Sequence, residues 1–350
     1  MDTLSNKIAP ENLSGEFNKI YGGGKNPVRV FAAPARINII GEHIDYNGGK
    51  VFPSAIDRHL YVTIRKRDDT RITYRDLKFP GIYTFDIRGE FAYKKENGYA
   101  NYLNGIVTIL KRRGCVFSGG FDALIGSDIP PAGGISSSSA LECGFAYALS
   151  EVFGFGISRK DIALIGQQSE HEFMNVNCGI MDQFIIATAK KNTAELLDCA
   201  TLDFEYVPLA LDDCRFVVMN TQKKRQLADS KYNERRAECA RALAILQEAK
   251  IPLHTAGKYT NTEDIPDLCV LTPKQLDECK SIFTDETIFR RARHCVTENA
   301  RVAKAAAALK EGNLPALGTL LKESHASLRD DYEVTGIELD TLADAANAER

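Results

Sequence analysis

The sequence predicts an α+β protein with two domains, a mixed-sheet domain over residues 1–205 and a helix-rich α+β domain over residues 206–350. Three observations predict this class. The first hundred residues contain several short runs rich in β-branched and aromatic residues, which is typical of strands. The second half contains long stretches with apolar residues at helical spacing. The 350 residues are enough for two domains of ordinary size.

The composition is ordinary for a globular protein and narrows the classes of function. Lys and Arg number 44 against 47 Asp and Glu, a net charge of −3, which argues against binding nucleic acid or an anionic membrane through bulk charge. No apolar run approaches the roughly 20 residues that cross a bilayer, and the amino terminus lacks a secretory signal pattern. The nine scattered cysteines form no CxxC pair, which favours reduced thiols. We therefore expect a cytoplasmic monomer.

The elements of the first half follow from local patterns. A helix over residues 10–21 ends at three glycines, and a helix over 99–112 has apolar residues at i, i+3 and i+4. Further helices are expected from about residue 137, over 159–174 and from residue 180. Strands are expected at 28–40, 51–55, 60–65, 71–74, 81–87 and 119–125.

The second half is expected to be mainly helical. Strands are predicted at residues 195–198, 205–209 and 216–220. Helices are predicted over 229–248, from a capping box at residue 272, and over 286–310, 315–328 and 337–349. The helices outnumber the strands available to cover, so we expect that the final strands of this domain are missing from the chain as given.

Residues 34–49 combine the end of a strand with a dense group of polar side chains. After Gly41, the chain presents Glu42, His43 and Asp45 before an Asn-Gly turn. Acidic and imidazole groups donate and accept directional hydrogen bonds, which suits a polyol whose hydroxyls need partners once removed from water. The alternative is a polar hairpin tip that binds nothing.

Residues 129–142 form a second informative stretch, in which paired glycines precede four serines and a helix. Gly133 and Gly134 allow close approach of the backbone to a ligand, and free amides at a helix start attract anions. Four consecutive serines exceed what a helix cap requires, so phosphate binding is favoured over a serine-rich cap. The stretch is not a Walker A loop, because it lacks the GxxxxGK pattern.

Asp182 lies in the first turn of the helix predicted from residue 180, where the helix dipole favours a negative charge. Taken alone, this position is explained by stabilisation of the helix start.

Three stretches together resemble the galactokinases, within the GHMP family of small-molecule kinases. Residues 36–49 resemble the galactokinase signature, although Ala35 and Ile44 stand where the family more often has Gly and Thr. Residues 131–140 are similar to the GHMP phosphate loop, and residues 177–183 form the third stretch. Segments 232–236 and 325–332 also resemble the family, so the likeness extends from near residue 15 to the end.

This resemblance implies the two-domain GHMP kinase fold and the transfer of the γ-phosphoryl group of ATP to the C1 hydroxyl of α-D-galactose. By resemblance, Asp182 would accept the proton of the sugar hydroxyl. Arg36 would hold Asp182 ionised and neutralise charge on the transferred group. A contact between these two residues, far apart in sequence, is therefore a prediction about the fold.

The implied ligand-binding residues fall into three sets. The sugar would be bound by Glu42, His43, Ile44, Asp45, Gly179 and Tyr232. The ATP phosphates would be bound by Ala132, Gly133, Gly134, Ile135, Ser136, Ser137 and Ser138. Mg²⁺ would be held by Ser138 and Glu170 as a hard cation that prefers oxygen ligands.

Three alternatives stay open. The first is a GHMP kinase for another substrate, such as N-acetylgalactosamine, arabinose or mevalonate; the acidic and imidazole cluster favours a sugar over mevalonate. The second is a galactose-sensing regulator without turnover, and the third is an anion-binding scaffold without a sugar site, which would leave residues 42–45 unexplained. A further glycine-rich motif of the family is absent before residue 350, so we expect a chain truncated before its final strands, with weak activity or none.

Overall fold

The structure is a computed structural model that describes residues 8–130, 133–222, 228–254 and 258–349. The chain forms two compact units: unit 1 takes Met1–Ile37 with Ala55–Ala189, and unit 2 takes Asn38–Ser54 with Lys190–Arg350. The units alternate along the sequence, because residues 38–54 belong to unit 2 whereas the residues on either side of them belong to unit 1. The compact units are made of segments that end at residues 37, 54 and 189, rather than at residue 205. The predicted domain boundary after residue 205 stays a prediction.

A five-stranded mixed sheet forms the frame of unit 1. Its strand order is β1-β3-β6-β4-β5. The β3/β6 and β4/β5 pairs are antiparallel and the β4/β6 pair is parallel, with Leu60 opposite Ser127 and Ile72 opposite Phe121. The strands are β1 (Arg29–Asn38), β3 (Pro53–Lys66), β4 (Arg71–Asp76), β5 (Ile82–Asp86) and β6 (Phe121–Ser127).

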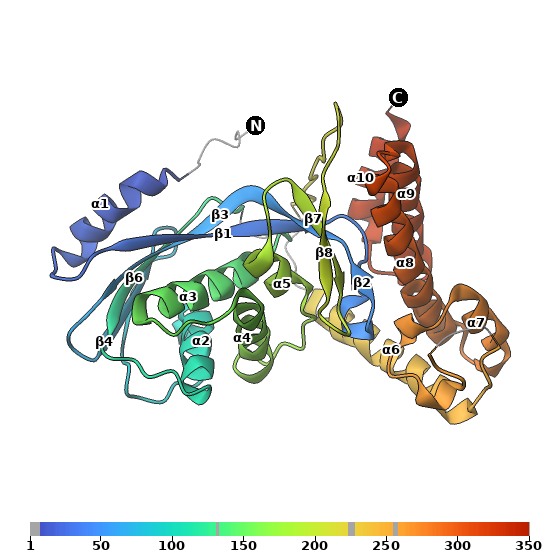
Figure 1. Ribbon diagram of the computed structural model, residues 1–350, viewed down its shortest axis with the longest axis horizontal. Helices are drawn as coiled ribbons and strands as arrows, with labels where there is room; N and C mark the ends of the chain where they lie inside the picture. The colour runs from blue at the N-terminus through green and yellow to red at the C-terminus, as the bar shows by residue number, and fades with distance from the viewer. Residues whose placement is uncertain (1–7, 131–132, 223–227, 255–257, 350) are drawn as a thin grey trace. The chain divides into compact units, whose positions relative to one another are not determined.

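Helices cover both faces of this sheet. Figure 1 shows α2, α3 and α4 on one face and α1 on the other. The helices of unit 1 are α1 (Pro10–Tyr21), α2 (Ala100–Arg112), α3 (Ser137–Phe153), α4 (Arg159–Glu172) and α5 (Met181–Thr188). Because α3 packs closely on the sheet, a side chain at Gly144 would come within 2.9 Å of Ala33.

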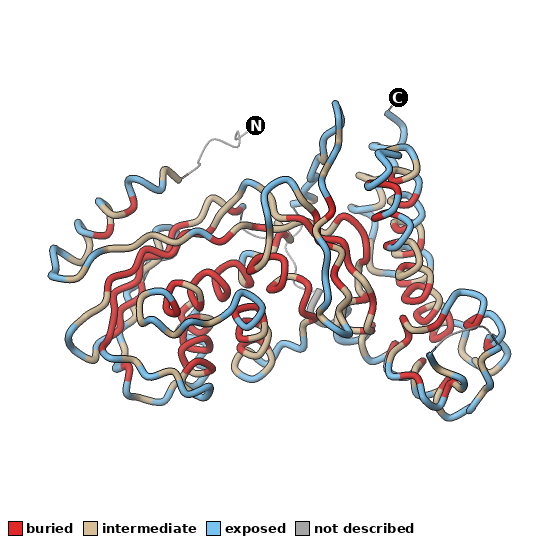
Figure 2. Tube along the Cα trace, in the orientation of Figure 1, coloured by how far each residue is buried: buried red, intermediate tan, exposed pale blue. Residues whose placement is uncertain are grey.

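The core of unit 1 lies between the sheet and α2–α5, where Figure 2 shows most of its buried residues. Tyr74 and Phe121 from the strands meet Phe145 of α3, with ring centroids 5.7–6.1 Å apart. Each such buried side chain contributes on the order of 1.5–3 kcal/mol through removal of apolar surface from water. This packing holds α3 against the sheet.

Unit 2 has a small sheet and a set of helices. Its sheet runs β2-β7-β8, all antiparallel. The strands are β2 (Lys50–Val51), β7 (Thr193–Asp198) and β8 (Phe204–Pro208). The helices are α6 (Ala228–Ala249), α7 (Pro273–Glu278), α8 (Glu286–Lys310), α9 (Leu314–Asp330) and α10 (Gly336–Ala348). Among the helices of the described residues, none combines the length and apolarity needed to cross a bilayer.

Two predictions about strands were wrong. Residues 51–55 and 60–65 do not form two strands, because β3 runs unbroken from Pro53 to Lys66 and only residues 50–51 form a separate strand. Residues 216–220 are not a strand, and Val217 and Val218 are 78% and 54% exposed. A strand needs neighbouring backbone partners, and among the described residues nothing pairs with this segment.

Candidate functional site

The predicted contact between Arg36 and Asp182 is confirmed, within unit 1. Arg36 lies near the end of β1, and Asp182 is the second residue of α5. The guanidinium donates from Nε to Oδ1 and from Nη2 to Oδ2, both at 2.6 Å. This bidentate geometry is the strong form of an arginine–carboxylate pair. The side chains are only 13% and 29% exposed, so water screens the pair weakly.

The turn before α3 faces this ion pair. Arg36 Nη1 donates to the carbonyl of Gly134 at 3.0 Å, and the Ser136 hydroxyl donates to Asp182 Oδ2. Gly134 has φ +69°, in the left-handed region, where a side chain would be strained. Arg36 therefore joins the predicted proton acceptor to the predicted phosphate turn.

The serines at the start of α3 have different surroundings. Ser136 occupies the N-cap position, yet its side chain makes no cap hydrogen bond, because its hydroxyl is directed to Asp182. Ser137 is exposed, and Ser138 is half-buried. The first-turn amides of α3 thus receive no bond from the cap side chain, which suits an anion site at a helix start. Ile135 is buried, and the predicted Ala132 lies outside the described residues.

Glu170 near the end of α4 is the predicted metal-binding carboxylate. Burial raises its pKa to about 7, and the nearby negative charge of Asp182 also acts to raise it. Burial also raises the pKa of Glu142, well above its usual range. Three acidic groups near one another, with a serine hydroxyl, form an oxygen-rich environment that a hard cation would stabilise. In the described chain no three His, Cys, Asp or Glu side chains form a ready-made metal cage.

Gly179 is a buried residue between α4 and α5, in unit 1. The segment before it is held by His171, whose Nε2 lies 2.8 Å from the Cys178 carbonyl oxygen. The remaining predicted sugar-binding residues all belong to unit 2.

Residues 41–50 of unit 2, here called the sugar loop, contain the predicted sugar-binding group. His43 has φ +62°, which is strained for a residue with a side chain. Its ring is held by a hydrogen bond that joins Nδ1 and the Tyr46 hydroxyl oxygen, 2.9 Å apart. Its carbonyl accepts from Asn47 at 3.1 Å. A strained residue with several fixed contacts is typical of a functional site.

The other predicted residues of this group occupy different environments. Tyr232 of α6 places its ring 5.8 Å from the His43 ring. Asp45 begins a short 3₁₀ helix, and its charge adds to the burial that raises the pKa of Cys199. The Glu42 carbonyl accepts a hydrogen bond from α8. Ile44 is fully buried, so a sugar contact there would have to be made by its backbone.

Two tyrosines that the sequence analysis did not select extend this cluster inward. Tyr46 lies 2.9 Å from Tyr332, hydroxyl to hydroxyl, and Tyr332 lies 3.1 Å from the Cys239 sulfur. Burial raises the pKa of both tyrosines, so both stay protonated. Both tyrosines lie in stretches that resemble the family, and this resemblance could have identified them from the sequence. Glu142 could have been identified because it lies four residues after Ser138, on the same face of the predicted helix.

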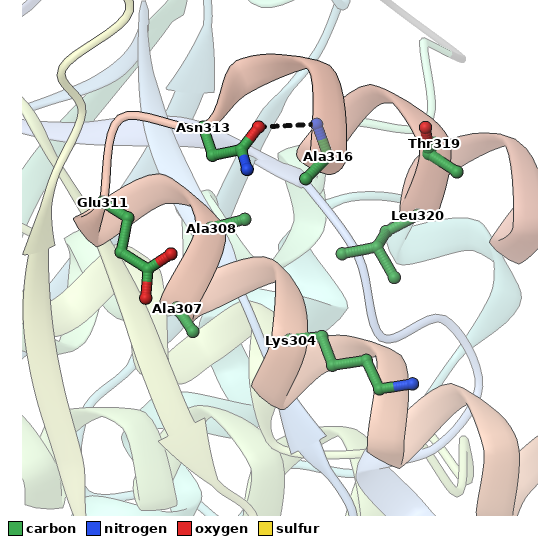
Figure 3. Close-up of a pocket in the computed structure, with 8 residues that line it drawn as sticks. All are labelled: Lys304, Ala307, Ala308, Glu311, Asn313, Ala316, Thr319 and Leu320. Atoms are coloured by element: carbon green, nitrogen blue, oxygen red, sulfur yellow. Dashed lines mark hydrogen bonds between the residues drawn. The ribbon is translucent and has the colours of Figure 1, made fainter.

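An open groove of about 500 Å³ lies along α8 and α9 (Figure 3). Four of its eight lining residues are apolar, and four are polar or charged: Ala307, Ala308, Ala316 and Leu320, against Lys304, Glu311, Asn313 and Thr319. None of the predicted site residues lines it, so it is not the candidate site.

Comparisons with known proteins agree with the geometry. The galactokinase galactose-binding signature matches residues 15–66, and the GHMP kinases N terminal domain matches residues 101–190. A galactokinase of Clostridium beijerinckii is 43% identical over 336 residues, covering 95% of this chain and 82% of that protein.

Solved structures give the same result. The crystal structure of Lactococcus lactis galactokinase complexed with galactose matches with a TM-score of 0.90 and 40% identity, covering 97% of this chain and 84% of that one. The mevalonate kinase of Methanococcus jannaschii matches with a TM-score of 0.61 at 16% identity, over 93% of this chain and 84% of that one. The second match shows a shared fold only.

Proposed function

This chain belongs to the galactokinase family of GHMP kinases, and from that premise we propose that it transfers the γ-phosphoryl group of Mg-ATP to the C1 hydroxyl of α-D-galactose. The observation that carries the proposal is the bidentate pair of Arg36 and Asp182 beside the turn before α3. The products are galactose 1-phosphate and ADP. The galactose complex of the Lactococcus lactis relative supports galactose as the acceptor.

In the proposed reaction, the C1 oxygen forms a bond to the γ-phosphorus while the bond to the β,γ-bridging oxygen breaks. Asp182 accepts the hydroxyl proton, and Arg36 offsets charge on the transferred group. A loose transition state releases the proton late, so Asp182 also orients the hydroxyl. Residues 133–138, with the predicted Ala132, bind the phosphates through amides and hydroxyls at the start of α3.

Ser138 and Glu170 are the proposed Mg²⁺ ligands, and the bound ion would neutralise charge on the β- and γ-phosphate oxygens. Glu42, His43 and Asp45 are the proposed readers of the sugar hydroxyls, with Ile44, Gly179 and Tyr232 as further contacts. A site built to hydrogen-bond a hydroxyl discriminates against analogues lacking it by about 10⁴-fold or more. We also expect a cytoplasmic monomer that binds neither nucleic acid nor membrane.

A coupled ADP-release assay over galactose, N-acetylgalactosamine, arabinose and mevalonate tests the proposal. We expect the highest kcat/KM for galactose, and ³¹P NMR should place the phosphate on C1. A higher kcat/KM for another sugar would reassign the substrate. Binding of ATP and galactose without ADP release would instead favour a galactose-sensing regulator.

The variant Asp182→Asn tests the proton-accepting role. Asn keeps a similar shape but cannot take up the proton, and general-base catalysis is typically worth 10²–10⁴-fold. We expect kcat to fall within that range while the KM for galactose changes little. A loss of less than tenfold would contradict the assignment of Asp182 as the base.

A further inference from the structure

The helix α8 directs polar side chains at the backbone of the sugar loop, and nothing in the proposed reaction uses them. His294 and Glu298 lie one turn apart on this helix and are both fully buried. Their partners in the loop are the adjacent residues Gly41 and Glu42. Burying a polar side chain costs free energy unless it is hydrogen-bonded. These hydrogen bonds therefore hold the loop backbone in one position relative to α8.

The contact with Glu298 fixes the first residue of the sugar loop. Its Oε1 accepts from the Gly41 amide at 2.9 Å and from the Ser324 hydroxyl at 2.6 Å. Its Oε2 accepts from Arg301 at 2.7 Å. Gly41 has φ +106°, and a side chain there would lie 3.0 Å from the backbone of β2 and from Val302 of α8. The loop therefore begins in direct contact with α8.

The contact with His294 fixes the next peptide and determines the tautomer of the ring. Nε2 lies 3.0 Å from the Glu42 carbonyl oxygen, which can only accept, so Nε2 carries the proton. Burial lowers the pKa of His294, which keeps the ring neutral. Nδ1 must then accept from the Ser327 hydroxyl of α9, 2.9 Å away. The result is a directed chain from Ser327 through His294 to Glu42.

These two contacts lie immediately before the strained residue of the loop. His43 keeps a left-handed backbone conformation, with φ +62°, which is unfavourable for a residue with a side chain. Such a conformation persists only where the surroundings hold it. His294 and Glu298 hold the peptide on its amino-terminal side, and Asn47 and Tyr46 hold its carbonyl and its ring.

We propose that His294 and Glu298 are positioning residues for sugar recognition, which hold Gly41 and Glu42 so that the loop presents Glu42 and His43 to the sugar. The inference rests on the proposed function for the identity of the sugar, but the contacts themselves do not depend on it. Neither residue is proposed to touch substrate. Their loss should therefore affect sugar binding more than phosphate binding or the chemical step.

The first test compares His294→Phe with His294→Gln. Phe keeps a planar ring without a donor, whereas the Gln amide can still donate to the Glu42 carbonyl. We expect His294→Phe to raise the galactose KM at least tenfold, with the ATP KM within twofold and kcat within about threefold. His294→Gln should return the galactose KM to within threefold of the wild type. His325→Asn, which removes a half-buried histidine of α9 paired with Asp340, is the matched control and should leave all three constants unchanged.

Hydrogen exchange of the peptides that cover residues 38–50 gives a readout independent of turnover. We expect this segment to exchange at least tenfold faster in His294→Phe than in the wild type, and at near wild-type rates in His294→Gln. Should His294→Phe not fold, Ser327→Ala takes its place, because it removes only the hydroxyl that orients the ring. A smaller change of the same kind, threefold or more in galactose KM and loop exchange, is expected.

Two results would overturn the inference. One is a galactose KM and loop exchange within twofold of the wild type in folded His294→Phe, or in Ser327→Ala where that variant is the one used. The other is an equal rise of the galactose and ATP KM values in His294→Phe and His294→Gln, which would indicate a general structural role. If the wild type releases no ADP with galactose, the proposed function fails, and loop exchange alone then decides on the positioning role.

Discussion

Replacement of Arg36 by Lys or Met is the most direct test of the ion pair on which the proposed chemistry depends. The guanidinium donates two hydrogen bonds to Asp182 at 2.6 Å and one to the Gly134 carbonyl at 3.0 Å. Lys keeps the charge but presents a single ammonium, which cannot reproduce the planar fork. Met keeps the approximate length and removes every donor.

The size of the effect follows from these contacts. Hydrogen bonds to charged groups are worth about 1.5–3 kcal/mol each, and partial exposure of Asp182 reduces that figure. Loss of the fork in Arg36→Lys should cost the transition state about 2–3 kcal/mol, or roughly 30- to 150-fold in kcat. Arg36→Met also removes the positive charge, and we expect about 10³-fold or more.

The assay is kcat at saturating galactose and Mg-ATP, with thermal unfolding measured in parallel. Arg29→Met is the matched control, because Arg29 lies on the same strand in an exposed ion pair with Glu151. Such surface pairs contribute about 0–1 kcal/mol, so this variant should keep both kcat and Tm. The double variant of Arg36→Met and Asp182→Asn should lose far less activity than the product of the two single losses, because each residue acts through the other.

Two results would refute this reasoning. A loss of less than tenfold in Arg36→Met would mean that the arginine does not support the transferred charge. Multiplying losses in the double variant would mean that Arg36 and Asp182 act independently, despite their bidentate contact.

Three further predictions concern the metal, the sugar loop and the tyrosine chain. Because the pKa of Glu170 is raised to about 7, the protonated carboxyl stabilises the metal-free fold fully below pH 4.5, and that contribution is lost as the pH rises through 7. Without Mg²⁺, Tm should therefore fall between pH 5.5 and 8, with a loss of at most about 3 kcal/mol in the free energy of unfolding. The Mg²⁺ Kd should rise about tenfold per pH unit below pH 7, and Glu170→Gln should abolish both trends. Gly41→Ala forces a side chain onto β2 at φ +106°, so the galactose KM should rise more than tenfold, while Gly23→Ala, with open space around it, should match the wild type in kinetics and Tm. Tyr332→Phe removes the hydroxyl that meets Tyr46, and chemical unfolding should show a loss of about 1 kcal/mol; unchanged stability would contradict that bond.

The elements and the ion pair were accessible from sequence because each leaves a local pattern. Helical periodicity predicted α2, α8 and α9, and the motif resemblance predicted the contact of Arg36 with Asp182 across 146 positions. The segment 216–220 has strand-like residues, but local propensity does not provide a partner. The residues of α8 that contact the loop were not predicted, because His294 and Glu298 are more than 250 positions from their partners and fall in an ordinary helical pattern.

The serine run shows why residue type and position are not enough to assign a role. Four serines at a helix start indicated more than a cap, since one serine suffices for capping. In the structure the N-cap serine does not cap at all: Ser136 adopts a left-handed backbone and directs its hydroxyl to Asp182, while Ser137 is exposed and Ser138 is half-buried. A cap bond would compete for the amides that an anion needs, and for the hydroxyl that Asp182 receives. The absence of the cap bond is therefore consistent with a phosphate site, and it depends on residues more than 30 positions away in the chain.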